Sequence, residues 1–269
     1  EKHPYHPYLS GHTCPEFGTL TADDGQTLHY SLLRPSDFDP SRPYPVILDV
    51  YGGPHVQTVT RGWGSLSDQY LSRQGYILFR LDNRGSWNRG KQFEDVIHHH
   101  TGHHEVSDQM KGVEWLQAQT FVNKDRIAIQ GWSYGGYMTL MTLLKAPPGT
   151  FAAAIAGAAV TDWRLYDTFY TERYMGTPQN NPAGYESSSI FPTLDRLSTP
   201  LLLVHGMADD NVTFDNATRL MAKLQEMGKP FDLMTYPGQR HGIRGEPLQQ
   251  HLMQTRMSFL DRHLKEPTS

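Results

Sequence analysis

Short apolar runs alternate along most of the chain with stretches that repeat apolar residues at helical spacing. The runs have the length and composition of buried strands, and the stretches have the one-sided pattern of helices that cover a sheet. The predicted strands are residues 44–50, 76–81, 126–130, 151–156, 201–204 and 231–236. The predicted helices are residues 66–74, 105–119, 138–144, 213–227 and 248–264. Because strands and helices alternate, the pattern predicts an α/β fold with a mostly parallel central sheet and helices on both faces.

Three segments depart from this alternation. Residues 16–35 contain two alternating runs around Asp24-Gly25, which predicts a β-hairpin. Residues 1–15 hold three Pro and three His without periodicity, and we expect an approach segment or linker before a single domain over 16–269. Residues 162–199 are rich in aromatic side chains and predict an insertion over one edge of the sheet, where α/β folds bind ligands.

Composition and charge exclude several classes of protein. The chain has 269 residues, with 38% apolar and 19% charged residues, which suits one large globular domain. A formal net charge of −4 without a basic run argues against nucleic-acid binding and against a polybasic membrane anchor. The longest run of small apolar residues, 151–160, is too short to span a bilayer, and the polar, Pro-rich start predicts no signal peptide in this chain. The single Cys14 excludes an internal disulfide and a cysteine zinc site.

A candidate nucleophile lies between a predicted strand and a predicted helix, in the sequence Gly131-Trp132-Ser133-Tyr134-Gly135. A G-x-S-x-G motif in this context places the serine on a sharp turn with its hydroxyl exposed. The flanking glycines allow backbone to approach closely, and the N-terminus of the following helix offers N–H groups to a developing oxyanion. The motif therefore predicts Ser133 as the nucleophile of a hydrolase.

A serine nucleophile needs a base and an orienting carboxylate, which follow it in the order acid then histidine in α/β-hydrolases. His241 follows the strand predicted over 231–236 and is the best candidate for the base. Asp209 and Asp210 lie in the loop after the strand over 201–204, and spacing alone does not choose between them. The other histidines after Ser133 are interpreted as packing or surface residues: His205, His251 and His263.

Several motifs together resemble one family of serine peptidases. The segments are GWSYGGYM at 131–138, HGMADDNV at 205–212, RHG at 240–242 and DVYGGP at 49–54. They resemble the prolyl oligopeptidase family. VTDWRLYDTFYTERYMG at 160–176 and EVSDQ at 105–109 are similar to its dipeptidyl peptidase IV subfamily, most closely in bacterial members. The resemblance extends from Glu16 to the last predicted helix and implies the α/β-hydrolase fold.

The resemblance also implies a role for individual residues. It makes Ser133 the nucleophile, Asp209 rather than Asp210 the orienting acid, and His241 the base. The hydroxyl of Tyr51 and the backbone N–H of Tyr134 would stabilise the oxyanion. The implied substrate-binding residues are Asn211, which would bond a substrate carbonyl, and a proline pocket made by Val160, Trp163, Tyr166, Tyr170, Tyr134 and Val212.

The activity implied is a serine dipeptidyl aminopeptidase that releases X-Pro or X-Ala dipeptides through an acyl-enzyme, without a cofactor. The alternatives are an acylaminoacyl peptidase or prolyl endopeptidase of the same family, an α/β-hydrolase esterase, and a catalytically inactive interaction domain. The intact set of candidate catalytic residues argues against the last of these. The resemblance implies a peptide with penultimate Pro or Ala as the substrate.

Further expectations concern partners and location. Full-length members carry a β-propeller before this domain, and residues 1–269 leave no room for one, so we expect it upstream. A homodimer is also implied, and the compartment stays open between bacterial periplasm and cytoplasm.

Five histidines lie close together in the segment 98–104. Although imidazoles bind zinc and nickel, no neighbouring carboxylate or cysteine pattern completes a site, and no metal is predicted.

Overall fold

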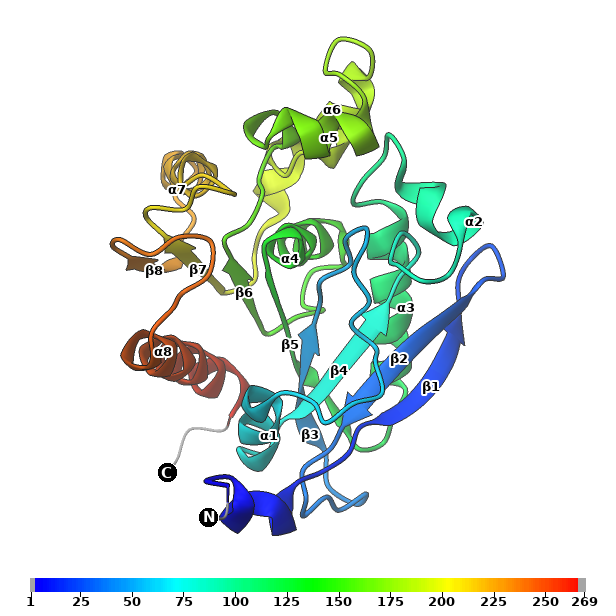
Figure 1. Cartoon of the computed structure of the whole chain (residues 1–269), viewed down its shortest axis with the longest axis vertical. Coiled ribbons are helices and arrows are strands. Elements are labelled where there is room, and N and C mark those ends of the chain that lie inside the picture. The colour runs from blue at the N-terminus through cyan, green and yellow to red at the C-terminus, as the bar shows by residue number, and fades with distance from the viewer. Residues whose placement is uncertain (1–2, 266–269) are drawn as a thin grey trace.

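The computed structural model describes residues 3–265 and contains one eight-stranded sheet in the order β1-β2-β4-β3-β5-β6-β7-β8 (Figure 1). Strand β2 pairs antiparallel with β1 and with β4, and all other neighbours are parallel. The predicted mostly parallel sheet with an N-terminal hairpin is therefore confirmed. The strands are β1 (Glu16–Thr21), β2 (Thr27–Leu33), β3 (Tyr44–Asp49), β4 (Ile77–Asp82), β5 (Val122–Trp132), β6 (Ala153–Gly157), β7 (Leu201–Gly206) and β8 (Asp232–Tyr236).

Helices cover both faces of this sheet, as the alternation predicts. The α-helices are α1 (Leu66–Arg73), α2 (Lys91–Glu94), α3 (His104–Gln117), α4 (Tyr134–Lys145), α5 (Thr168–Met175), α6 (Pro182–Ser188), α7 (Asp215–Glu226) and α8 (Glu246–Leu264). Short 3-10 helices are η1 (His6–Gly11), η2 (Asp95–Ile97), η3 (Trp163–Leu165) and η4 (Phe191–Arg196). None of the helices in residues 3–265 has the length and hydropathy needed to cross a membrane.

Two hydrophobic layers hold the helices on the sheet. On one face, Ile47 of β3 lies in the same buried cluster as Leu71 of α1 and Leu260 of α8. On the other face, the next residue, Leu48, lies with the side chains of α3, α4 and α7. Successive residues of a strand point to opposite faces, so one strand supplies both layers. Replacing the fully buried Leu48 with Ala would cost about 2–5 kcal/mol of unfolding free energy.

Two predicted elements meet at a sharper junction than the pattern suggests. Strand β5 extends beyond the predicted 126–130 to Trp132, and α4 begins at Tyr134 rather than near residue 138. The early turn of α4 contains Gly135 and Gly136, which are poor helix formers and carry no apolar pattern. Tertiary packing explains the glycine at position 135. The backbone of α4 approaches Val50 so closely here that a Cβ atom on Gly135 would collide with the Val50 oxygen. Only Ser133 therefore separates strand from helix.

The N-terminal segment has more structure than an approach segment requires. It contains η1, and His12 stacks on Trp63 with ring centroids 4.2 Å apart. Thr13 exchanges two hydrogen bonds with the side chain of Gln69 in α1, at 3.0 and 2.8 Å. The segment lies against α1, and the proposed domain boundary at residue 16 stays a prediction.

The aromatic-rich segment 162–199 forms η3, α5, α6 and η4 between β6 and β7. Figure 1 shows α5 and α6 beyond one end of the central strands, while the two termini lie near the other end. This insertion follows the carboxyl end of β6, and β5, β7 and β8 run parallel to β6, so their carboxyl ends lie at the same edge of the sheet. The candidate residues that follow these strands therefore gather beneath it.

Candidate active site

Ser133 occupies a strained turn at the carboxyl end of β5. Its backbone has φ +61° and ψ −119°, a region that costs a non-glycine residue about 1–3 kcal/mol. Its N–H donates to the carbonyl oxygen of Gly157 at 2.8 Å, which ties the turn to β6. A Cβ atom on Gly131 would collide with the backbone of Gly135 and Val50, so glycine is needed there. The turn has the geometry that the G-x-S-x-G motif predicts.

His241 lies in the loop after β8 and is paired with Asp209. The Nδ1 atom of His241 is 2.8 Å from Oδ2 of Asp209, and Oδ1 of Asp209 accepts the N–H of Asn211 at 2.9 Å. The side chain of Asp209 is fully buried, while that of His241 is 25% exposed. An ionised carboxylate only accepts hydrogen bonds, so Nδ1 carries the proton and Nε2 is left as an acceptor. This is the tautomer that a general base requires.

Asp210 points elsewhere. Its carboxylate pairs with Nη1 of Arg240 at 2.9 Å, and both side chains are mostly exposed. Residue spacing does not distinguish the two aspartates, but their contacts do, because His241 bonds Asp209 and Arg240 bonds Asp210.

A second histidine, His205, also contacts the Asp209 carboxylate. Nε2 of His205 lies 2.8 Å from the carbonyl oxygen of Val212 and 3.2 Å from Oδ2 of Asp209. A carbonyl oxygen only accepts, so Nε2 carries a proton that also faces the carboxylate. Burial lowers the pKa of His205, which keeps it neutral. His205 is a packing residue, as expected, and also helps to solvate a buried charge.

Tyr51 and Tyr134 meet beside Ser133. Tyr51 follows β3, and its ring centroid lies 6.0 Å from that of Tyr134. Burial raises the pKa of Tyr51, so its phenol keeps its proton and can donate. Tyr134 is the first residue of α4, where backbone N–H groups have no partner within the helix and the helix dipole is positive.

These residues line a hollow of 400 Å³ at the carboxyl ends of the strands. Its walls are mostly aromatic, and nine of its ten residues were candidates from the sequence. The lining is Tyr51, Trp132, Ser133, Tyr134, Val160, Trp163, Tyr166, Tyr170, Asn211 and His241. Trp132 is the one lining residue that the sequence analysis did not name as a site residue.

The aromatic side of the hollow is rigidly arranged. The rings of Trp163 and Tyr170 stack at 6.1 Å with an interplanar angle of 15°, and Tyr166 stands edge-on to both. The hydroxyl of Tyr166 donates to Oδ1 of Asn211 at 2.6 Å. This bond leaves the amide N–H groups of Asn211 as donors. Val212 is fully buried and lies outside the lining residues, so its pocket role stays a prediction from the resemblance.

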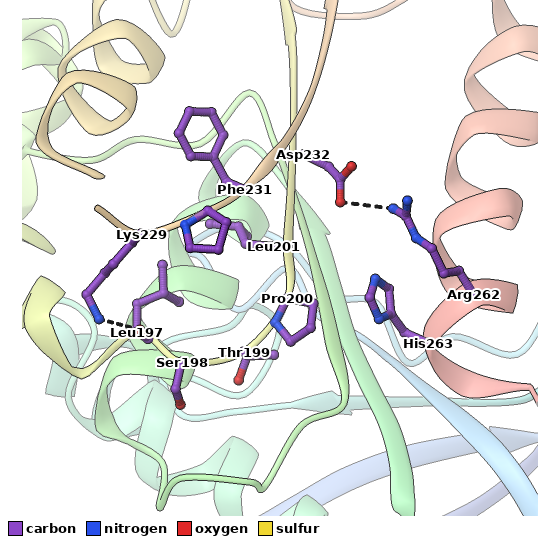
Figure 2. Close-up of a pocket in the computed structure, with 11 residues that line it drawn as sticks. Leu197, Ser198, Thr199, Pro200, Leu201, Lys229, Phe231, Asp232, Arg262 and His263 are labelled. Atoms are coloured by element: carbon purple, nitrogen blue, oxygen red, sulfur yellow. Dashed lines mark hydrogen bonds and ion pairs between the residues drawn. The ribbon is translucent and has the colours of Figure 1, made fainter. Parts of the chain in front are cut away.

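A larger hollow of 490 Å³ lies at the opposite ends of the strands (Figure 2). It adjoins Leu201 and Asp232, the first residues of β7 and β8, and Figure 2 shows Asp232 paired with Arg262 of α8. Its lining includes Ser198, His263 and Asp232, but the Asp232 carboxylate pairs with Arg262 rather than with the histidine. The smaller hollow is therefore the candidate active site.

The histidine-rich segment 98–104 is a local cluster. His98 and His99 stack with ring centroids 3.9 Å apart, and α3 begins at His104. Within residues 3–265, no three or more His, Cys, Asp or Glu side chains converge as ligands for a metal ion.

Trp132 was missed as a contributor to the site, because the motif says nothing about where its indole points. Its Nε1 atom donates to the backbone oxygen of His241 at 2.8 Å. The contact of His205 with Asp209 was missed for the same reason. Neither contact has a signal in residue spacing.

Comparison with known proteins identifies the family. The sequence pattern of the prolyl oligopeptidase family matches residues 64–267. The chain belongs to this family. It is 42% identical over 256 residues to mouse dipeptidyl peptidase 8, a match that covers 91% of this chain and 29% of the mouse protein. The family resemblance seen in the motifs is confirmed.

Solved structures agree with this assignment. Dipeptidyl peptidase 4 from Porphyromonas gingivalis superposes with a TM-score of 0.90 at 38% identity, over 94% of this chain and 36% of that one. A Bacteroides ovatus protein assigned as a dipeptidyl aminopeptidase IV superposes with a TM-score of 0.93 at 38% identity, over 98% of this chain and 37% of that one. The fold is thus the α/β-hydrolase fold of these enzymes. The chain spans less than two fifths of the length of each of these relatives.

Proposed function

We propose that residues 16–269 form the catalytic domain of a serine dipeptidyl aminopeptidase that releases X-Pro or X-Ala dipeptides. The observation that carries the proposal is one hollow that joins Ser133, on its strained turn, with His241, whose Nδ1 atom bonds Asp209 at 2.8 Å. The names of the relatives support the class of reaction.

The proposed reaction runs through an acyl-enzyme. Nε2 of His241 accepts the proton of the Ser133 hydroxyl as Oγ attacks the scissile carbonyl carbon. The resulting oxyanion accepts hydrogen bonds from the Tyr51 hydroxyl and the Tyr134 N–H. His241 then gives its proton to the departing amine. A water molecule then attacks the acyl-enzyme ester, again with His241 as the base, and releases the dipeptide from Ser133. Asp209 stabilises the His241 imidazolium in both acylation and deacylation.

Proline specificity comes from the aromatic walls. Proline has no N–H, so a pocket selects it by ring shape and stacking rather than by hydrogen bonds. The stacked Trp163 and Tyr170, with Tyr166 edge-on, make a flat slot beside Ser133. Because Oδ1 of Asn211 accepts from Tyr166, its amide N–H groups would donate to a carbonyl of the same substrate.

The anchor for the substrate's free amine belongs to the upstream β-propeller in this proposal. No residue that lines the 400 Å³ hollow is acidic in the described part of the chain. An α-ammonium group binds best to paired carboxylates, and remote contacts of this kind orient the scissile bond as well as adding affinity. The propeller and a homodimer are parts of the proposal for the whole protein.

The test measures kcat/KM on the 269-residue chain for an aryl ester, a Gly-Pro anilide and N-acetyl-Gly-Pro anilide. We expect clear turnover of the ester, slow cleavage of both anilides, and little discrimination between the free and acetylated amines. Ester turnover with no cleavage of either anilide would favour the esterase alternative. A strong preference for the free amine, at the rate of a full-length enzyme, would place the anchor within this domain and contradict the proposal.

A further inference from the structure

A fully buried carboxylate lies behind the active-site hollow. Glu105, in the first turn of α3, has no exposed surface. Its Oε1 atom accepts the Tyr134 hydroxyl at 2.7 Å and the Gly102 N–H at 2.9 Å. Its Oε2 atom accepts the His103 N–H at 3.1 Å. The carboxylate is therefore well bonded, and one of its partners is the residue next to the nucleophile.

Burying this group is unfavourable. Transfer of a carboxylate from water into a protein interior favours the neutral form, and burial raises the pKa of Glu105. The three hydrogen bonds oppose that shift. Lys145 lies nearby, with Nζ donating to the Gly102 oxygen at 2.6 Å. None of the chemical steps proposed above uses Glu105. The unfavourable free energy of burying its carboxylate therefore suggests that this residue has another role.

Tyr134 connects this carboxylate to the substrate. Tyr134 follows Ser133 in the chain, its side chain is buried, and it is one of the residues that line the hollow. The ring centroid lies 5.4 Å from that of Trp163 and 6.0 Å from that of Tyr51. The bond to Glu105 is made at the far end of the ring, where it restricts tilt most strongly. Glu105 thus fixes one wall of the hollow from behind.

We infer that Glu105 is a positioning residue that sets the selectivity of the hollow for proline by holding the Tyr134 ring in place. The inference rests on the proposed function. A fixed wall contacts the whole face of a proline ring, whereas the single methyl group of alanine touches little of it. Releasing the wall should weaken binding of proline in the transition state and leave alanine nearly unchanged.

The same helix offers a matched control. Tyr137 lies one turn further along α4 and is also fully buried. Its hydroxyl donates to the carbonyl oxygens of Ser188 at 2.9 Å and Thr101 at 3.2 Å, and it does not line the hollow. Tyr137→Phe therefore removes a buried hydroxyl of the same kind while the Glu105–Tyr134 bond stays intact.

The experiment measures second-order labelling rates of the 269-residue chain with Gly-Pro and Gly-Ala diphenyl phosphonates and with a simple fluorophosphonate. The variants are Tyr134→Phe, Glu105→Gln, Glu105→Ala and Tyr137→Phe. Tyr134→Phe and Glu105→Ala should lower the proline-to-alanine rate ratio by about tenfold, the scale of a small change in pocket contacts. Glu105→Gln keeps one oxygen acceptor for Tyr134 and should lower the ratio less. In the Glu105 and Tyr137 variants the fluorophosphonate rate should change by less than about twofold, because neither residue lines the hollow and the nucleophile is untouched.

Tyr137→Phe should lower stability and leave the ratio unchanged. An unchanged ratio in Tyr134→Phe and Glu105→Gln would overturn the inference, as would an equal loss in Tyr137→Phe. These two conservative variants decide the question even if Glu105→Ala fails to fold. A wild-type chain labelled by the fluorophosphonate but equally by both dipeptide probes would overturn the inference alone. A wild-type chain labelled by none of the probes would overturn the proposed function as well.

Discussion

The indole N–H of Trp132 donates a hydrogen bond to the backbone carbonyl oxygen of His241 at 2.8 Å. Trp132 directly precedes Ser133, so the last residue of β5 connects the turn that carries Ser133 to the loop that carries His241. The Asp209 carboxylate holds the same histidine by its ring. His241 is thus held at both its backbone and its side chain.

Trp132→Phe should therefore slow catalysis without weakening substrate binding. The variant keeps an aromatic ring in the hollow but removes the donor, and a hydrogen bond of this kind contributes about 1 kcal/mol, or about fivefold in rate. We expect the loss in kcat for an aryl ester, with KM nearly unchanged. Trp115→Phe, in a side chain that packs on Phe79 outside the hollow, is the control. An unchanged kcat in Trp132→Phe would reduce the bond to a packing detail.

Asp209→Asn and Asp210→Asn should differ strongly. Asparagine at 209 would present an amide that favours the wrong tautomer of His241, and the corresponding change in another serine protease lowers kcat by about 10⁴-fold. Asp210 makes an exposed pair with Arg240, and such pairs contribute about 0–1 kcal/mol, so its loss should change kcat by less than about fivefold. Steady-state kinetics on an aryl ester separates the two. The opposite ranking would reassign the orienting acid.

Tyr51→Phe should lower kcat more than it raises KM. The substitution removes one oxyanion donor and keeps the bulk of the ring, and single donors of this kind contribute about 10²–10³-fold to kcat elsewhere. The measurement is kcat and KM for an ester and for a Gly-Pro anilide. If kcat stayed at the wild-type value, Tyr51 would be only a packing residue of its loop.

The histidine-rich segment should make stability depend on pH. Burial, with the Lys145, His100 and His104 charges, lowers the pKa of His103 to about 4, below the ordinary value of about 6.5. Between these values the unfolded chain binds a proton that the folded chain does not bind at this site. The contribution of His103 to the free energy of unfolding is therefore fully present above about pH 6.5 and is lost as the pH falls toward 4.

Urea unfolding at pH 7.5, 5.5 and 4.5 measures this effect. In His103→Gln the free energy of unfolding should fall less between pH 7.5 and 4.5 than in the wild type. His98→Gln changes an exposed histidine and should keep the wild-type dependence. Identical pH dependence in His103→Gln and the wild type would contradict the assignment to His103.

Most of the fold could be predicted because it depends on patterns that the sequence displays directly. The sequence shows buried strands and one-sided helices in runs such as 44–50 and 213–227. The G-x-S-x-G motif lies between the strand predicted over 126–130 and the helix predicted over 138–144. The start of α4 at Tyr134 could not be predicted, because tertiary packing around Gly135 overrides the poor helix propensity of the glycines. The structure in residues 3–15 also has no periodic signal.

The sequence predicts which residues belong to the candidate site from their type and their order along the chain, but not which of their side chains contact one another. Asp209 and Asp210 are adjacent in a loop, so their different partners depend on side-chain direction, which spacing does not encode. Glu105 resembles any acidic residue in the first turn of a helix, and its role depends on meeting Tyr134, 29 residues away. Contacts of this kind are created by the fold.

The most direct test of the whole account is the site of covalent labelling by a fluorophosphonate. The wild-type chain should gain one adduct, which peptide mapping by mass spectrometry should place on Ser133. Ser133→Ala should gain none and should lose several orders of magnitude in ester turnover, because the other residues retain only oxyanion and binding contributions. An adduct on another residue, or undiminished labelling of Ser133→Ala, would show that this chain is not a serine hydrolase acting through Ser133.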